Sequence, residues 1–136
     1  MQEARVRWVE DDRFLATTPS GHAVPFDSNR QTNLAPGPME MLLVALGACT
    51  ATDVVTILKK KRQPLAGLEV AVRGERAATP PTVWTKLEIH YRVRGRGLDE
   101  KAVRDAIELS ENKYCSVAAM LKKTAPIRFD FEMTEA

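Results

Sequence analysis

The sequence predicts an α+β fold in which antiparallel sheets surround one long central helix. Short segments with alternating apolar and polar side chains have the period of half-buried strands. One long apolar run, residues 41–58, has the composition of a buried helix. The elements follow the order strand-strand-strand-helix-strand-strand-helix-helix-strand. Because strands and helices come in groups, this order favours α+β over a doubly wound parallel sheet.

The first 37 residues are predicted as a three-stranded meander followed by a loop. Ala4, Val6 and Trp8 alternate with arginines, and turn residues separate this strand from the next two. The three strands are expected over residues 4–8, 14–18 and 23–26, and the polar loop over residues 27–37.

The central helix is predicted from Pro38 to about Arg62. Proline suits the first helical position, Glu40 then lies in the first turn, and basic residues gather in the last turn. The apolar run inside it includes Asp53, and no second such segment supports a membrane protein. We therefore expect a buried helix and no membrane span.

Two strands, two helices and a last strand complete the chain. Asp99 is a suitable N-cap for a helix to about Glu111, which Asn112 and Lys113 are expected to interrupt. A short helix should begin near Cys115. The strands are predicted at residues 68–73, 83–94 and 127–133.

Length, charge and motifs exclude several classes of protein. A chain of 136 residues fits one domain, residues 1–136. Its net charge of +2 does not favour a nucleic-acid binder. No Gly-rich phosphate loop, CxxC or HExxH is present, so the sequence predicts neither a cofactor nor a standard metal site.

The two cysteines are predicted to be thiols. The N-terminal residues lack the apolar segment of a secretory signal, so the expected location is the reducing cytoplasm. Cys49 lies in the central helix with Asp53 one turn away, and a carboxylate there would raise the thiol pKa. Cys115 opens a short helix beside Lys113, which favours a thiolate. Either cysteine could instead be a buried core residue.

A metal site is a weaker interpretation of the same residues. Cys49, Cys115, His22 and His90 have suitable ligand types, but they lack the paired short spacings of zinc sites. His90 falls on the outward phase of its strand and His22 in a turn, so exposed histidines are expected.

The two cysteines and their flanking residues resemble a known family. The run GPMEMLLVALGACTATDVV, followed 66 residues after its Cys by that of KYCSVAAML, is similar to the OsmC/Ohr family of thiol-dependent peroxidases. Within that family the similarity is to the YhfA-like branch. It spans nearly the whole chain and agrees with the predicted order of elements.

The resemblance implies a fold, an assembly and a reaction. It implies an intertwined homodimer with long helices packed at its centre and sheets drawn from both chains. It also implies an antioxidant enzyme in which Cys49 reduces an organic hydroperoxide and becomes a sulfenic acid. Cys115 then condenses with it to a disulfide, and a dithiol reductant, lipoyl-type or a small thiol, resets the pair.

One part of the family pattern differs in this chain. Family members have a Glu ten residues before the first Cys, paired to an Arg, but Met39 holds that position here and Glu40 follows it. Glu40 and Cys49 are expected on opposite helical faces, about 13 Å apart along the axis. Glu40 would then act through a partner chain or by clamping a loop. Arg13 is the first candidate for the activating arginine and Arg30 the second.

Two functions remain open on these residues. The first is a cysteine-based peroxidase with Cys49, Cys115, Arg13, Arg30 and Glu40 at its site. The alternative is a non-catalytic dimer of the same fold that responds to redox state or binds a small apolar ligand, because the displaced Glu would leave the thiols poorly activated.

Overall fold

The structure, a computed structural model, describes residues 1–136. The chain, which the sequence predicts to be one domain, groups into two compact units, Met1–Leu42 and Leu43–Ala136. Helix α1 (Pro38–Lys60) begins in the first unit and continues into the second.

The first unit is the predicted meander. Strands β1 (Arg5–Glu10), β2 (Arg13–Thr17) and β3 (Ala23–Asp27) form one antiparallel sheet in the order β1-β2-β3. Their alternating residues do not enclose a core of their own, since Trp8 is 70% exposed and Val6 is 64% exposed. A three-stranded sheet of this kind gains stability by packing its apolar side chains against another element.

Helix α1 ends two residues before the predicted Arg62. The amide of Arg62 donates to the carbonyl of Lys59, and that of Gln63 to the carbonyl of Leu58, at 3.0 and 2.9 Å. Arg62 has a φ of 57°, so the chain leaves the helix through a left-handed residue in the geometry of a Schellman motif. Backbone hydrogen bonds therefore end the helix before Pro64 is reached.

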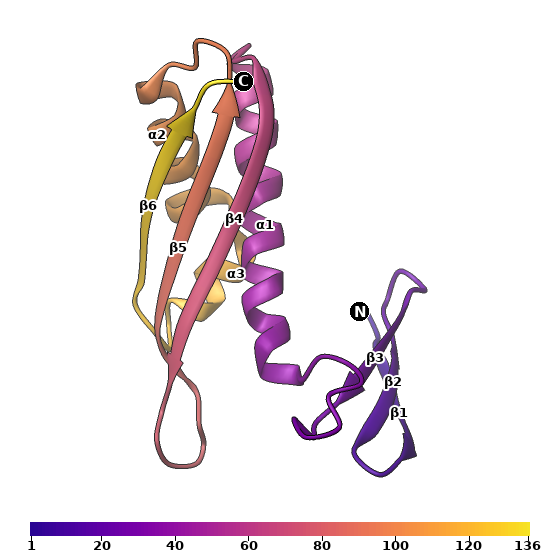
Figure 1. Ribbon diagram of the computed structural model, residues 1–136. Coiled ribbons are helices and arrows are strands. Elements are labelled where there is room, and N and C mark those ends of the chain that lie inside the picture. Colours follow the sequence, from indigo (N-terminus) through magenta and orange to yellow (C-terminus); the bar gives the residue numbers. More distant parts are fainter. The chain divides into compact units, whose positions relative to one another are not determined.

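The second unit contains the remaining elements (Figure 1). Helix α2 begins after Asp99, whose side chain caps it as predicted, and a π-helical turn, η1, continues directly from its end. The predicted interruption at Asn112 and Lys113 is therefore wrong, because both residues are part of this turn. The elements are β4 (Leu65–Arg76), β5 (Trp84–Gly95), α2 (Glu100–Leu109), η1 (Ser110–Tyr114), α3 (Ser116–Leu121) and β6 (Ile127–Thr134).

The sheet of the second unit has the order β4-β5-β6 and mixes both pairings. Strands β4 and β5 form an antiparallel hairpin, but β5 and β6 are parallel, with Ile89 opposite Phe129. The prediction of antiparallel sheets is wrong for this pair. The helical segment between β5 and β6 carries the chain back to the start of the sheet, as a parallel connection requires.

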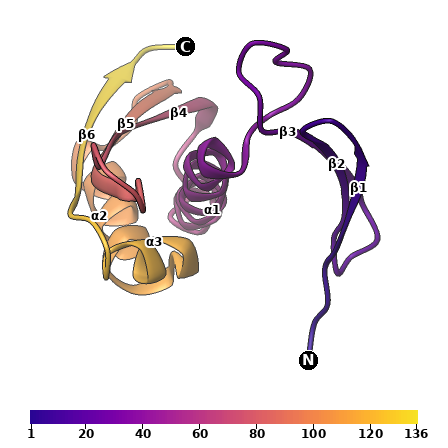
Figure 2. The same ribbon diagram turned by 90° about the horizontal axis from the view of Figure 1, so that it is seen from below.

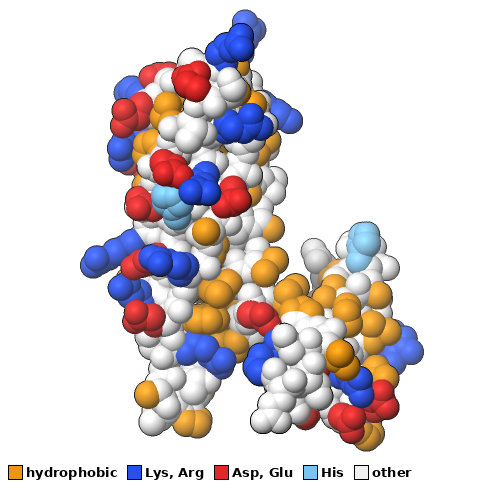
Figure 3. All heavy atoms as spheres, viewed as in Figure 1, with side chains coloured by type: hydrophobic (Ala, Val, Ile, Leu, Met, Phe, Trp, Pro, Cys, Tyr) orange, Lys and Arg blue, Asp and Glu red, His pale blue; other side chains and the backbone are white.

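The core lies between this sheet and the helices, which cover one of its faces (Figure 2). Strand β5 supplies Leu87, Ile89, Tyr91 and Val93, all 0–1% exposed, and α2 supplies Val103, Ala106 and Ile107, all 0% exposed. The opposite face carries charged side chains of both signs (Figure 3). Among them, Arg73 pairs with Glu88, His90 with Asp130 and Arg92 with Glu132.

Helix α1 is buried along one stripe only. The stripe consists of Leu46, Thr50, Val54 and Leu58, each four residues from the next. The helix is long enough to cross a membrane, and its most apolar stretch has a mean hydropathy of 2.0. Within the chain, 22% of that stretch is buried. The expected buried helix is thus found for one face, while the rest of its apolar surface is more open, with Val44 58% exposed.

Candidate functional site

Two thiols and one carboxylate meet in the second unit. The sulfur atoms of Cys49 and Cys115 and a carboxylate oxygen of Asp53 all lie within 4.8 Å of one another. Both cysteines are free, Cys115 is buried, and Cys49 and Asp53 are half-buried. The fold therefore joins two cysteines that are 66 residues apart in the sequence.

Helix α1 and the start of α3 hold these groups. Cys49 and Asp53 are four residues apart on α1 and so share one helical face. Cys115 is the N-cap of α3, and its sulfur accepts a hydrogen bond from the amide of Ala118 at 3.3 Å. The turn η1 delivers Cys115 to α1, since the Cys115 amide closes that turn on the carbonyl of Ser110 at 2.8 Å.

A buried polar network lies beside the thiols. The Thr50 hydroxyl is 2.7 Å from the Tyr91 hydroxyl and 2.8 Å from that of Ser110. Tyr91 donates to the Glu111 carboxylate at 2.8 Å, and Ser110 donates to Asp53 at 2.9 Å. Each of these buried polar groups thus has a partner, which offsets the cost of removing it from water.

Sequence reasoning did not assign this network to the site. Periodicity placed Tyr91 on the inward face of its strand and Glu111 at the end of a helix. A tyrosine in a buried phase usually has a hydrogen-bond partner for its hydroxyl, and this is the sequence signal of the network. Their convergence with Thr50 requires the packing of α1 against β5 and η1.

The two thiols differ in their surroundings. Burial raises the pKa of Cys115 to about 12, the Ala118 amide opposes this shift, and Cys49 and Glu111 add to it. The expectation that the helix start favours a Cys115 thiolate is therefore wrong, because loss of solvent outweighs one amide hydrogen bond. The ammonium group of Lys113, the residue expected to favour the thiolate, lies over the ring of Tyr114, 5.2 Å from its centroid.

Tyr91 keeps its proton at neutral pH. Burial raises the pKa of its hydroxyl well above the usual range, and the nearby Glu111 carboxylate adds to the effect. A protonated Tyr91 is a fixed donor to Glu111.

Comparison with known proteins decides the family. The model of the OsmC-like protein family matches residues 31–130. Protein YhfA of Escherichia coli (strain K12) is 45% identical over 134 residues, which cover 98% of this chain and 99% of that protein. The chain belongs to the OsmC family. The predicted family and its α+β fold are thereby confirmed.

Two solved structures have the same fold as this chain. A hypothetical protein from Aquifex aeolicus VF5 is 32% identical with a TM-score of 0.89, covering 100% of this chain and 98% of that one. An organic hydroperoxide resistance protein OsmC from Legionella pneumophila has a TM-score of 0.72 at 12% identity, covering 97% and 96% of the two chains. At this low identity, the similarity to the Legionella pneumophila protein is one of fold.

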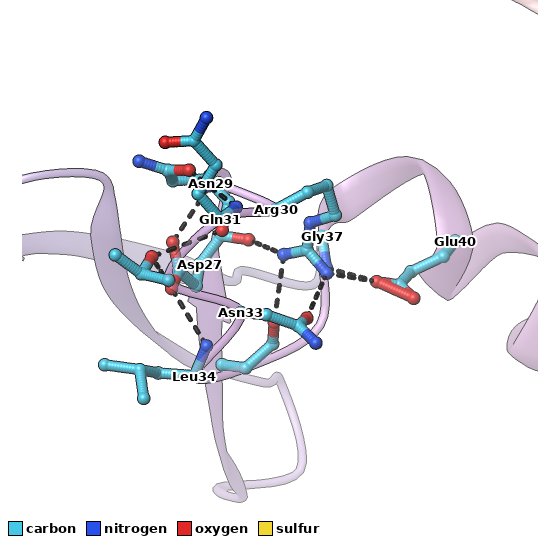
Figure 4. A network of polar contacts seen from close by, with 10 residues as sticks. Asp27, Asn29, Arg30, Gln31, Asn33, Leu34, Gly37 and Glu40 are labelled. Atoms are coloured by element: carbon cyan, nitrogen blue, oxygen red, sulfur yellow. Dashed lines mark hydrogen bonds and ion pairs between the residues drawn. The ribbon is translucent and has the colours of Figure 1, made fainter.

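Arg30 and Glu40, which the OsmC resemblance indicated, bind one another in the first unit. Arg30 donates to the Glu40 carboxylate at 3.0 Å, and the same carboxylate oxygen accepts from the Gly37 amide at 2.8 Å (Figure 4). Arg30 also donates to the carbonyls of Asp27 and Ala35. Glu40 thus clamps the loop that leads into α1, one of the two roles considered for it.

Asp27 holds the other end of the same loop. Its buried carboxylate accepts from the Thr32 hydroxyl at 2.6 Å and from the amides of Leu34 and Asn29 at 3.0 and 2.9 Å. These hydrogen bonds, led by that from Thr32, lower the pKa of Asp27 to about 2. Together with the Arg30–Glu40 pair, they give the loop of residues 28–37 a fixed path (Figure 4).

Arg13, the first candidate for the activating arginine, is the first residue of β2 in the first hairpin. It pairs with Glu10 at 3.0 Å and with Asp11 at 3.2 Å, and its side chain is 32% exposed. Neither predicted histidine belongs to the cluster of thiols: His22 binds Ser20 in a turn, and His90 binds Asp130 on the charged face of the sheet.

Proposed function

We propose that this chain is a thiol-dependent peroxidase that reduces organic hydroperoxides, with Cys49 as the attacking thiol and Cys115 as the resolving thiol. The observation that supports this most directly is that their sulfur atoms lie within 4.8 Å of one another. A disulfide needs an S–S distance of about 2.05 Å. Side-chain movements of a few ångströms would therefore suffice to link the two thiols.

The reaction uses the two thiols in sequence. The Cys49 thiolate attacks the outer oxygen of the hydroperoxide, the O–O bond breaks, and the alcohol leaves after taking a proton. Cys49 is now a sulfenic acid. Cys115 attacks its sulfur, the hydroxyl leaves as water with the Cys115 proton, and a disulfide forms. A dithiol reductant, lipoyl-type or a small thiol, restores both thiols by exchange and is itself oxidised.

The surroundings of the thiols support this order. Cys49 is half-buried, whereas Cys115 is 3% exposed. The thiolate is the nucleophile, and burial raises the pKa of Cys115 to about 12. A protonated, buried Cys115 is protected from direct attack by peroxide and reacts when the sulfenic acid forms beside it.

Cys49 requires a cation in this mechanism. Asp53 lies one turn away, so its carboxylate is close to the sulfur that attacks the peroxide. Arg13 is our first candidate to supply the opposing charge and Arg30, held by Glu40, is the second. In the first unit, Arg13 pairs with Glu10 and Asp11, and Arg30 pairs with Glu40.

The proposed enzyme is a cytoplasmic homodimer that serves in the oxidative stress response. Helix α1 buries one stripe within the chain and leaves apolar side chains such as Val44 exposed. The sheet of the first unit likewise exposes Trp8 and Val6. A second copy would cover these surfaces, since obligate dimer interfaces are large and apolar. The two free thiols fit a reducing compartment.

A non-catalytic role is the second candidate. Met39 holds the position of the family Glu, and Asp53 and Glu111 add negative charge near the thiols. A groove of about 410 Å³ between α1 and β4 is lined by apolar residues and is large enough for a small apolar ligand. Such a dimer would bind a ligand or respond to redox state without turnover.

Turnover of tert-butyl hydroperoxide with a dithiol distinguishes the two candidates. The peroxidase predicts multiple turnovers per chain in wild type and loss of turnover in Cys49→Ser. Oxidation of wild type to a disulfide without turnover would favour the redox-responsive dimer. Absence of any thiol oxidation by stoichiometric peroxide would overturn the peroxidase.

A further inference from the structure

We propose that Cys49, Asp53 and Cys115 form a binding site for a thiophilic divalent cation, with Zn²⁺ the best match. Their ligand atoms lie within 4.8 Å of one another. Zn²⁺ bonds of about 2.3 Å to sulfur, arranged tetrahedrally, place two sulfur atoms about 3.8 Å apart. With a Zn–O bond of about 2.0–2.2 Å, each sulfur would lie about 3.6 Å from the carboxylate oxygen. The present separations of at most 4.8 Å thus need to shorten by about 1 Å or slightly more for all three groups to bind one ion.

The chemistry of the three ligands selects the metal. Two thiolates and one carboxylate favour Zn²⁺ over Mg²⁺ or Ca²⁺, which prefer oxygen ligands. Three protein ligands leave the fourth tetrahedral position for water or an incoming molecule. Cys49 and Asp53 are half-buried, so that position has access to solvent, while the buried Cys115 anchors the opposite side.

Neighbouring groups already hold the ligands as metal sites require. The Ser110 hydroxyl donates to Oδ2 of Asp53 at 2.9 Å and so orients this carboxylate. Ser110 is in turn fixed by Thr50 at 2.8 Å. The Ala118 amide donates to the sulfur of Cys115 at 3.3 Å. Such outer contacts orient metal ligands and contribute about 10–100-fold to metal affinity.

Asp53 makes no ion pair, so no salt bridge has to break when a cation binds. The salt bridges of the second unit lie instead on the outer face of its sheet and on α2, with Arg73–Glu88 and Lys101–Asp105 as examples. A divalent cation would offset two of the three negative charges that two thiolates and a carboxylate carry once the metal has displaced the thiol protons.

Bound Zn²⁺ would regulate the proposed peroxidase, and this part of the inference rests on that function. Both thiols release a proton when the metal binds and are then occupied as ligands. One hydroperoxide and two protons would convert the zinc-bound dithiolate into the disulfide, one alcohol, one water and free Zn²⁺. The thiolates lose two electrons and the peroxide bond gains them, while zinc stays Zn²⁺. Zinc should thus slow oxidation, and oxidation should release zinc.

Binding is tested first without peroxide. Reduced protein, freed of metal by a chelator, is titrated with Zn²⁺ in competition with a chromophoric chelator. We expect one Zn²⁺ per chain in wild type. Asp53→Asn, which removes a direct ligand, should weaken binding by more than the roughly 10–100-fold that an outer contact contributes, and Cys49→Ser and Cys115→Ser should weaken it further. Asp105→Asn, which removes a half-buried carboxylate on α2 that pairs with Lys101, should bind as wild type does.

A second measurement uses wild type alone and so does not depend on the folding of a variant. One equivalent of Zn²⁺ should protect both thiols from an alkylating agent, and Mg²⁺ should not. The proposed site would be overturned if Zn²⁺ left the rate of alkylation unchanged, or if the titration gave a stoichiometry other than one Zn²⁺ per chain. It would also be overturned if Asp53→Asn and Asp105→Asn bound Zn²⁺ with equal affinity.

The two proposals fail separately. Zinc binding without peroxide turnover would contradict the peroxidase and leave the metal site standing. Turnover without zinc binding would contradict the metal site alone. If both hold, one equivalent of tert-butyl hydroperoxide should release about one Zn²⁺ per chain, and retention of zinc by the oxidised protein would overturn the regulatory link.

Discussion

The Ser110 hydroxyl donates a hydrogen bond to the Asp53 carboxylate at 2.9 Å and thereby joins the π-helical turn η1 to helix α1. Asp53 is one turn from Cys49, and Ser110 is the residue whose carbonyl receives the Cys115 amide. One contact thus fixes the two elements that carry the two thiols. The relative position of Cys49 and Cys115 depends on this contact and on the buried network behind it.

Organic hydroperoxide should convert wild type to an intramolecular Cys49–Cys115 disulfide. Cys115→Ser should instead accumulate sulfenic and then sulfinic acid at Cys49, because no resolving thiol remains. Cys49→Ser should leave the buried Cys115 largely unoxidised. Mass spectrometry of the thiols after stoichiometric peroxide measures all three outcomes. First oxidation at Cys115 in wild type would require the two roles to be exchanged.

Loss of the activating arginine should make Cys49 react only at higher pH. An opposite charge within about 4–6 Å lowers a thiol pKa by about 1–3 pH units. Arg13→Ala should therefore shift the alkylation profile of Cys49 upward and slow peroxide reduction. The profile is measured in a Cys115→Ser background with a chelator present, and Arg30→Ala tests the second candidate. Unchanged profiles in both variants would favour the non-catalytic dimer.

Tyr91→Phe should lower the free energy of unfolding by about 1–3 kcal/mol. The substitution removes the hydroxyl that donates to the buried Glu111 and contacts Thr50, and leaves both without that partner. Denaturant unfolding at neutral pH gives the difference. Tyr114→Phe is the matched control, because Tyr114 is 51% exposed and its variant should be as stable as wild type. Equal stability of both variants would contradict the network.

Asp27 should make the loop into α1 sensitive to acid. Its pKa is about 2 in the folded chain against an ordinary value of 3.8, so its carboxylate stabilises the fold above about pH 4. This stabilisation is lost as the pH falls toward 2. Asp27→Asn should unfold at a lower temperature than wild type at pH 6, and the difference should shrink between pH 4 and 2. A difference that does not change with pH would show that the charge of Asp27 has no part in it.

The chain should sediment as a dimer at micromolar concentration. Val44→Glu, on the exposed face of α1, should shift the population toward monomer, because it places a charge in an apolar interface. Leu109→Glu, at an exposed leucine of α2, is the control and should leave the dimer intact. A folded wild-type monomer at that concentration would contradict the proposed assembly.

The sequence by itself determined which segments are strands and helices, and in what order. Alternation predicted the long strands β4 and β5, and Pro38 and Asp99 predicted two helix starts, because these signals depend on neighbours within a few residues. The residues around each cysteine also resembled those of the OsmC/Ohr family. The spacing of 66 residues between the two cysteines, however, carries no information on the distance between them in space.

Only the tertiary structure decided which distant residues meet. The parallel pairing of β5 with β6 follows from the path of the helical connection, and the approach of Cys49 to Cys115 from the packing of η1 against α1. The same packing buried Cys115 and so reversed the pKa shift that its helix-start position predicted. Burial and proximity arise when elements far apart in the chain close on a common core, and local sequence signals do not extend over that separation.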